Sequence, residues 1–525
     1  MQRRDFLLTG AAFGTSAFMC PSPVRAQTTS PVVRDTALPL VQGGVYQAGS
    51  QAQLFVDQMV VRSTDKVTFR LHPARKHPAN PLVRADQPWE GWGLSLYGNV
   101  IFDEAEKRFK MWYICESPEY FPKYAALYAT SEDGIHWEKP LIGTVASEIA
   151  KHNAVLDKCE QPNVIKDDDD PDPARRYKMF AYLRPHGYHT LVSPDGLHWT
   201  QYSEKPICPH EDVITGYYDR QRKLWIALPK THAAVVPGLP HQRRVFSLAT
   251  SADFTTWSEP ELVLYPDAKD DAGAMARIEE VRPLLDVPDD PALVRTEFYG
   301  MGVYQAESCT LGFPWVFTIN NNGRFGNHEG PSELQLAVSR DLKHWERPFR
   351  ISCVPRGTPQ EWDCGFFVTG AEALRVKDEV WLYYGGSNYL HGTPCLFRAK
   401  NTGRKTRFTA SIGLATWPLD RFVSADGPAN GGTLTTVPLA FTGNRLELNV
   451  NGAPATQSGV VRVELLDAAG VPLQGFGLSD AVTSDSLRET VTWKTKSDLS
   501  ALRTRPVSLR FHLQNAELFS FAFRE

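Results

Sequence analysis

Carboxylates recur at five places in the sequence, each directly before a predicted β-strand. The five segments are Pro88–Gly93, Cys159–Asn163, Pro209–Val213, Arg295–Gly300 and Gln360–Gly365. Their acids are Glu90, Glu160, Glu211, Asp212, Glu297, Glu361 and Asp363. Carboxyl groups held close together repel one another and raise one another's pKa. A pair with separated pKa values suits cleavage of a glycosidic bond, because one carboxyl protonates the leaving oxygen while another attacks or activates water.

Two tryptophans and one histidine accompany these acids. Trp92 and Trp362 lie within two of the segments, and flat aromatic faces suit sugar rings. His391 follows the last such strand region. We expect the catalytic residues to be Glu90, Asp212, Glu297 and Asp363. We expect the substrate-binding residues to be Trp92, Glu160, Glu211, Glu361, Trp362 and His391. A solvated loop carboxylate, or a structural histidine at position 391, is the alternative for each residue taken alone.

Five repeated units explain why the acidic segments should meet. Short aromatic and β-branched runs, separated by Asp, Gly and Pro, begin at Tyr97, Asn163, Val213, Phe298 and Phe367. Such runs are typical of strands. Units of about 60 residues with four strands each predict a five-bladed β-propeller. The innermost strand comes first in each unit, so the residues before it should converge on a central funnel.

A second motif, Ser-x-Asp-x-x-x-Trp, ends four of the units. Its copies are Ser131–Trp137, Ser193–Trp199, Ser251–Trp257 and Ser339–Trp345. The Asp can accept backbone N–H bonds in a tight turn, and the Trp should be largely buried between blades. This motif is therefore predicted to be scaffold. The runs Ala52–Val61 and Val67–Pro73 are expected to close the ring, which removes exposed sheet edges.

The sequence as a whole predicts an all-β protein with a five-bladed β-propeller at 27–424 and an antiparallel β-sandwich at 425–525. The C-terminal part alternates apolar and polar residues, as in "NRLELNV" and "GVVRVELLD". It carries no cluster of acids or histidines. Packing against the propeller is its expected role.

Residues 1–26 resemble a twin-arginine export signal. Arg3 and Arg4 precede an apolar run too short to span a bilayer comfortably, and Pro23–Ala26 suits cleavage. A periplasmic or secreted product follows, with no membrane insertion after signal cleavage. The formal charge is −4 and no long basic run is present, so nucleic acid is not an expected partner.

No metal or cofactor is predicted. The run "KDDDDPDP" at Lys166–Pro173 favours a hairpin tip of solvated acids over a calcium site. The sequence contains no H-E-x-x-H, no G-x-S-x-G and no phosphate loop. Seven cysteines follow the predicted signal without a C-x-x-C pair, which favours buried free thiols.

The five-unit plan, the outer turns and the acids before inner strands resemble the five-bladed glycoside hydrolases of families 32, 43 and 68. The segments "LFVDQMVV", "KHPANPLV", "RTEFYGM", "EWDCGFF", "LYYGG" and "GVPLQGFGLSD" look like a bacterial family-32-like group with a C-terminal β-sandwich. The resemblance covers nearly all of residues 50–525. It implies a nucleophile or base in blade one, where this chain offers Glu90, and a general acid in blade three, where it offers Asp212. Glu211 should then point away, since successive strand residues face opposite sides.

These expectations describe an exported glycoside hydrolase acting on an oligo- or polysaccharide. By family analogy, a furanoside such as a fructan or arabinan is the first expected substrate. One alternative is a glycoside phosphorylase, which needs basic residues in the funnel, with Arg282 as a candidate. A second is a sugar-binding propeller that releases no product. The oligomeric state is left open.

Overall fold

The computed structural model of the protein describes residues 28–29, 41–42, 44–91, 93–117, 119–121, 124–147, 149–183, 187–208, 212–323, 327–392, 408–452 and 458–525. The predicted export signal, Trp92 and Glu211 lie outside these residues. Among the described residues, no helix has the length and apolar character needed to cross a membrane.

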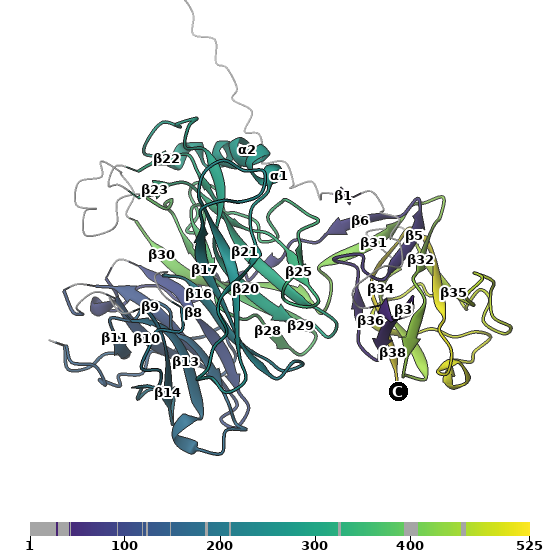
Figure 1. Cartoon of the computed structure of the whole chain (residues 1–525), viewed down its shortest axis with the longest axis horizontal. Helices are drawn as coiled ribbons and strands as arrows, with labels where there is room; N and C mark the ends of the chain where they lie inside the picture. The colour runs from purple at the N-terminus through teal and green to yellow at the C-terminus, as the bar shows by residue number, and fades with distance from the viewer. Residues whose placement is uncertain are drawn as a thin grey trace, which may run out of the picture.

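Five antiparallel sheets follow one another along the chain and form the left-hand body in Figure 1. Blade one contains β8 (Leu94–Asp103), β9 (Arg108–Glu116), β10 (Tyr124–Ser131) and β11 (Ala154–Asp157). Blade two contains β12 (Asn163–Lys166), β13 (Tyr177–Leu183), β14 (Gly187–Ser193) and β15 (Thr200–Gln201). Blade three contains β16 (Ile214–Asp219), β17 (Leu224–Ala233), β18 (Arg243–Ser251) and β19 (Glu261–Leu264).

The remaining two blades carry additional short strands. Blade four contains β20 (Arg295–Gln305), β21 (Thr310–Ile319), β24 (Ser332–Leu334), β25 (Ala337–Ser339) and β26 (Trp345–Glu346). Blade five contains β27 (Phe367–Thr369), β28 (Leu374–Val376), β29 (Glu379–Ser387), β30 (Ala410–Pro418) and β7 (Arg75–Lys76). Helices α1 (Ala268–Ala272) and α2 (Ala274–Glu280) and the hairpin of β22 (Asn321–Asn322) and β23 (His328–Glu329) also belong to this body.

The first strands of the five blades form a closed ring. β8 contacts β12, β12 contacts β16, β16 contacts β20, β20 contacts β27, and β27 contacts β8 again. This arrangement confirms the predicted five-bladed propeller. It also places the starting ends of all five inner strands around one axis.

The N-terminal segment closes the ring, but through a different strand from the predicted ones. The outermost strand of blade five is β7, which pairs antiparallel with β30. Lys76 of β7 also forms an ion pair with the buried carboxylate of Asp363, with Nζ and Oδ2 2.6 Å apart. The prediction that the runs Ala52–Val61 and Val67–Pro73 close the ring is wrong. Their strands β4 (Gln53–Leu54), β5 (Val61–Asp65) and β6 (Thr68–Leu71) instead pair with strands of the C-terminal sheets. These partners are β38 (Ala516–Arg524), β32 (Gly432–Thr436) and β31 (Val423–Gly427), respectively.

The Ser-x-Asp-x-x-x-Trp turns have the predicted backbone geometry. In the first copy, Asp133 Oδ1 accepts hydrogen bonds from the N–H groups of Ile135 and His136, both at 2.8 Å. The other three copies repeat these bonds. The four Asp side chains therefore fold turns and take no part in a central site.

The four motif tryptophans pack against the preceding blade, as predicted. Trp137 meets Tyr383 of blade five edge-on at 5.9 Å, and Trp257 meets Phe180 of blade two at 5.4 Å. Trp199 and Trp345 pack on the cores of blades one and two and of blades three and four. All four are largely buried, as predicted, although each keeps a minor part of its surface exposed. Their turns lie at the outer rim, where one edge of each indole stays accessible to solvent.

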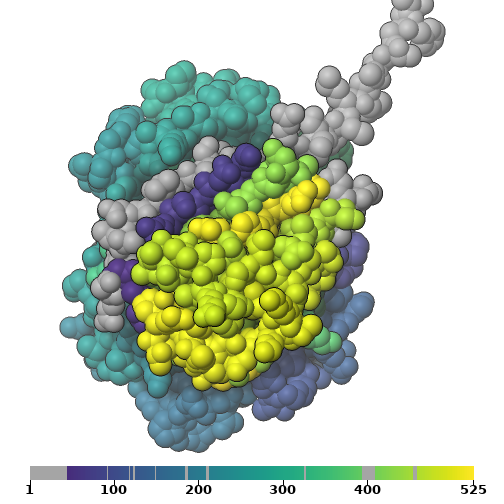
Figure 2. Space-filling view, turned by 90° about the vertical axis from the view of Figure 1, so that its right-hand side faces the viewer, coloured from purple at the N-terminus to yellow at the C-terminus, as the bar shows by residue number. Residues whose placement is uncertain are grey.

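The C-terminal part forms two packed antiparallel sheets, the right-hand body in Figure 1. One sheet contains β31 (Val423–Gly427), β34 (Arg445–Asn451), β36 (Asp485–Thr490) and β38 (Ala516–Arg524), with β1 (Thr28–Thr29), β4 and β6. The other contains β5, β32 (Gly432–Thr436), β35 (Val460–Leu466) and β37 (Ser508–Gln514). A smaller sheet joins β2 (Val41–Gln42), β3 (Val45–Gly49) and β33 (Leu439–Phe441). Figure 2 shows the N-terminal residues in purple lying against the yellow C-terminal residues.

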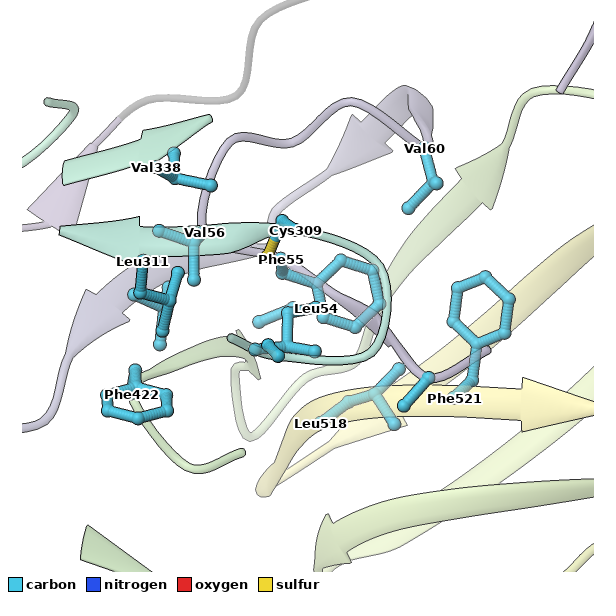
Figure 3. Close-up of a cluster of buried hydrophobic side chains, with 14 of the residues drawn as sticks. Leu54, Phe55, Val56, Val60, Cys309, Leu311, Val338, Phe422, Leu518 and Phe521 are labelled. Carbon is cyan, nitrogen blue, oxygen red and sulfur yellow. The ribbon is translucent and has the colours of Figure 1, made fainter. Parts of the chain in front are cut away.

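A continuous apolar core joins the two bodies. Figure 3 shows Leu54 and Phe55 of the N-terminal segment beside Leu311 of blade four and Phe521 of the sandwich. Two ion pairs reinforce this contact: Asp57 with Arg340 at 2.6 Å and Glu307 with Arg524 at 2.8 Å. The sandwich therefore packs on the propeller, as expected. The six described cysteines are buried, and no two of them form a disulfide with each other; their burial agrees with the prediction.

Loss of the Lys76–Asp363 pair should weaken the ring. In Lys76→Met the backbone pairing of β7 remains, but the Asp363 carboxylate stays buried without its cation. We expect a loss of about 3 kcal/mol in the free energy of unfolding, measured by urea denaturation with tryptophan fluorescence. The matched control is Arg75→Met on the same strand, because Arg75 is exposed and its pair with Glu379 at 3.3 Å is worth less than about 1 kcal/mol. Equal losses in the two variants would contradict a closing role for Lys76.

Candidate active site

A cavity of about 600 Å³ opens where the inner strands begin. Segments of all five blades line it, including Leu94 of β8, Tyr182 of β13, Asp212 before β16, Tyr299 of β20 and Phe366 before β27. Five tyrosines contribute to its wall: Tyr97, Tyr124, Tyr182, Tyr299 and Tyr389. Phenol groups offer both a flat apolar face and a hydrogen-bonding hydroxyl, which is the combination that a sugar ring requires.

Blade three supplies a polar wall because its second and third strands meet at the cavity. Lys230 and His232 are two residues apart on β17, so their side chains face the same side of the sheet. His232 stands directly opposite Arg244 on β18, which brings Arg244 to the same face. Asp212, just before β16, forms an ion pair with the Lys230 ammonium group. Its side chain is 39% exposed, so this carboxylate is accessible from the cavity.

Blade four holds the cations of that wall in place. Glu297 of β20 is buried and forms ion pairs with Arg244 and with Arg295, the latter at 2.7 Å. Burial alone would raise the pKa of Glu297, but the two guanidinium charges outweigh it and lower that pKa below its usual value. Glu297 is therefore ionised and positions Arg244.

Tyr299 connects these groups to blade five. The Lys230 ammonium lies 4.5 Å from the centre of the Tyr299 ring, and the Arg244 guanidinium carbon lies 5.3 Å from it. The hydroxyl of Tyr299 is 3.2 Å from Nε2 of His391. Nδ1 of His391 lies 2.6 Å from the carbonyl oxygen of His328, which can only accept. This carbonyl assigns the proton to Nδ1, so Nε2 accepts a hydrogen bond from Tyr299.

Two of the predicted catalytic acids form internal ion pairs away from the cavity. Glu90 is completely buried, with Oε1 2.9 Å from the hydroxyl of Tyr113 and Oε2 2.8 Å from the ammonium of Lys139. Asp363 pairs with Lys76 and accepts a hydrogen bond from the hydroxyl of Tyr384 at 2.7 Å. Neither side chain lines the cavity.

The other predicted residues divide in the same way. Asp212 and His391 line the cavity, whereas Glu160, Glu297, Glu361 and Trp362 do not. Glu361 is exposed and accepts the N–H of Thr358 at 2.6 Å, and Trp362 stacks on Tyr384 at 5.5 Å. Arg282, the candidate for a phosphate site, pairs with Glu279 and with Asp289 and also lies outside the cavity lining. The structure thus does not gather the predicted carboxylates around one pit.

The cavity contains functional groups that the sequence interpretation missed. Glu116, at the end of β9, is the second carboxylate among the described lining residues, with Asp212 as the first. Lys230, His232 and Arg244 lie on the second and third strands of blade three, so the pattern of acids before first strands does not point to them. In an antiparallel blade the second strand ends, and the third begins, at the same rim as the first strand starts. The segments "PKTHA" and "RRV" carried the signal, as charged residues within otherwise apolar strands.

Three side chains in the sandwich, outside this cavity, are spaced like the ligands of a metal ion. His72, Asp426 and Glu517 each offer one ligand atom within 4.8 Å of the others. The guanidinium of Arg70 pairs with both carboxylates, at 2.6 Å from Asp426. This internal cation already balances the two acids, so the set does not fit a metal ion well.

Comparisons with known proteins show similarity of structure only. No family model and no curated protein sequence matches this chain. A structure described as a glycoside hydrolase is similar with a TM-score of 0.36 and 12% identity, over 68% of this chain and 92% of its own. A β-1,2-mannobiose phosphorylase from Listeria innocua is similar with a TM-score of 0.41 and 11% identity, over 66% and 98%. An N-acetylgalactosamine deacetylase from F. plautii has a TM-score of 0.36 and 13% identity, over 72% and 96%. At these values, the similarities carry no conclusion about the activity of this chain, and membership of families 32, 43 or 68 stays a prediction.

The His391 imidazole should stay neutral well below pH 6. Burial, reinforced by the charge of Arg244, lowers the pKa of His391 from 6.5 to about 4. The unfolded chain then binds a proton between about pH 6.5 and pH 4 that the folded chain does not, so this histidine lowers stability as the pH falls through that window. We expect ring resonances of His391 in an NMR titration to show an imidazole that is still mostly neutral at pH 5. An inflection near pH 6.5 would contradict the structure of this wall.

Proposed function

We propose that the protein is a carbohydrate-active enzyme that cleaves glycosidic bonds in the cavity at the start of its inner strands. The observation that carries this proposal is the accessible carboxylate of Asp212 in blade three, in a cavity that Glu116 of blade one also lines. Two carboxyl groups on a shared cavity provide the acid and the base or nucleophile that the reaction needs. The surrounding tyrosines suit the sugar rings.

The environment of Asp212 favours a role for each acid. The Lys230 ammonium beside Asp212 favours the ionised form of that carboxyl. A carboxylate that is ionised at the start of the reaction suits the base or the nucleophile. Glu116 is then the proton donor to the leaving oxygen. This order is the reverse of the one expected by family analogy, in which blade three supplies the acid.

Lys230 and Tyr299 are positioning residues in this proposal. Lys230 keeps Asp212 charged, and its ammonium rests on the ring of Tyr299. His391 fixes the hydroxyl of that tyrosine from the other side. A base held by such contacts keeps its geometry when substrate enters, which lowers the entropic cost of the reaction.

Amide variants test the two carboxyl roles. Asp212→Asn and Glu116→Gln should each reduce turnover of an unactivated oligosaccharide at least ~10²-fold, with the fold retained in circular dichroism. Glu116→Gln should keep much more of its activity on nitrophenyl glycosides, because nitrophenolate leaves without a proton. The glycoside panel begins with furanosides and includes pyranosides. Glu132→Gln is the control. Glu132 is 90% exposed at the opposite mouth of the ring, where the inner strands end, so this change should leave turnover unaltered.

The outcome of these assays separates the proposal from its rivals. Near-normal turnover in both amide variants would overturn the roles of Asp212 and Glu116. Glycan binding by the wild type without any product would favour a sugar-binding propeller instead.

We also propose that the protein is exported through a twin-arginine signal at residues 1–26. Changing Arg3 and Arg4 together to Lys keeps the charge but removes the arginine pair. Precursor should then accumulate in the cytoplasm, as measured by cell fractionation and blotting, while the unchanged chain is processed and leaves it. Equal export of both chains would show that the pair is not the signal.

A further inference from the structure

We propose that the wall formed by Lys230, His232 and Arg244 is an oxyanion subsite, which binds a carboxylate, sulfate or phosphate group next to the reacting sugar. The inference rests on the proposed function, because it places this anion in the same cavity as Asp212 and Glu116. Three hydrogen-bond donors on one face of the paired strands β17 and β18 form the site. They are Lys230 and His232 on β17 and Arg244 on β18.

The charges around this wall do not cancel. Asp212 balances Lys230, and Glu297 is shared by two guanidinium groups, those of Arg244 and Arg295. One carboxylate cannot neutralise two arginines, so one positive charge remains beside the cavity when Glu116 is protonated, as its proposed role of proton donor requires. The whole chain has a formal charge of −4, which makes this local excess opposite in sign to the protein. Such a focused field attracts an anionic ligand.

The pKa values of two neighbouring histidines are lowered in part by this positive charge. Burial is the first cause of the lowered pKa of His328 and of His391, and the charge of Arg244 follows it in both. The imidazole of His328 on β23 and that of His391 in the segment after β29 thus experience the same positive potential.

The donors of this wall are partly unused by the protein. Nε of Arg244 is buried and has no hydrogen-bond partner within the part of the chain that the structure describes. Buried donors without an acceptor are costly, and an oxyanion provides several acceptor atoms at once.

Packing holds the two cations in position before any ligand binds. The side chain of Lys230 is only 4% exposed and that of Arg244 only 16%. The Arg244 guanidinium lies over the rings of Tyr299 and Phe317, at 5.3 and 5.7 Å. These side chains have therefore already lost their freedom, unlike flexible lysines and arginines on a surface, and binding loses little further entropy.

The oxyanion has two possible sources. It can be a carboxylate or sulfate group on the glycan itself. It can also be free inorganic phosphate that takes the place of water. In that case a phosphate oxygen bonds to the anomeric carbon, the bond from that carbon to the leaving oxygen breaks, and Glu116 gives its proton to the leaving oxygen. The products are a sugar phosphate and the shortened glycan.

Direct binding measurements test the subsite without turnover. Phosphate, sulfate and glucuronate are titrated separately into the wild-type protein by calorimetry at low salt. We expect at least one of the three to bind, more weakly as NaCl is raised, and Arg244→Gln to reduce its affinity at least ~10-fold. Asp212→Asn should retain the anion while losing turnover, so failure of the subsite and failure of the proposed function give different results.

Controls and second variants keep the outcome decisive. Arg220→Gln, which removes an exposed arginine at the opposite mouth, should bind the anion as the wild type does. If Arg244→Gln does not fold, His232→Ala should show the same loss of affinity. The proposal is overturned if none of the three anions binds at millimolar concentration, or if a folded Arg244→Gln and His232→Ala both bind normally.

Turnover assays then distinguish the two sources. Dependence of turnover on inorganic phosphate, with a sugar phosphate as product, identifies free phosphate as the ligand. Turnover without phosphate, together with an Arg244→Gln variant whose KM rises at least ~10-fold for anionic glycosides but not for neutral ones, identifies a group on the glycan.

Discussion

Closure of the ring by the N-terminal strand is the constraint on which the site depends. β7 completes blade five from a position before blade one, and Lys76 carries its charge to Asp363 at the start of that blade's inner strand. With this contact made, β27 lies beside β8, and all five inner strands begin around one axis. An open ring would leave a sheet edge exposed and would separate blade one from blade five. Glu116 and His391, which come from those two blades, would then no longer share a cavity.

Contacts between distant chain segments also explain why some of the predicted carboxylates are structural while another faces the cavity. Glu90 and Asp363 lie where a lysine from another segment reaches them, Lys139 in one case and Lys76 in the other. Each is buried with its charge balanced, so it stabilises the place where chain segments meet. Asp212 is also paired with a lysine, but that lysine and the acid both face the cavity. Exposure of the Asp212 side chain, and not its residue type, is what makes it available for the proposed reaction.

The sequence was sufficient to predict the fold and insufficient to predict the cavity. Strand-forming residues and turn motifs are local features of the sequence. The five blades and the Ser-x-Asp-x-x-x-Trp turns could therefore be predicted from short segments. Partners such as Lys139 for Glu90 are 49 residues apart in the chain, and nothing local links them. The segment "PKTHA" showed Lys230 and His232 on alternate positions, yet only the antiparallel register with β18 shows that Arg244 joins them.

The ring of Tyr299 connects the ion pairs of blades three and four with the groups that line the cavity. Tyr299 receives Lys230 and Arg244 against its ring and donates its hydroxyl to His391. Glu297, two residues earlier on the same face of β20, holds Arg244 and Arg295. The two cations are thereby kept at the cavity even though like charges repel. Because Asp212 is tied to one of these cations and Glu297 to the other, any anion that binds the wall also weakens the hold of Lys230 on Asp212. In the proposed reaction, anion binding and the role of Asp212 as base are thus coupled through the same few contacts.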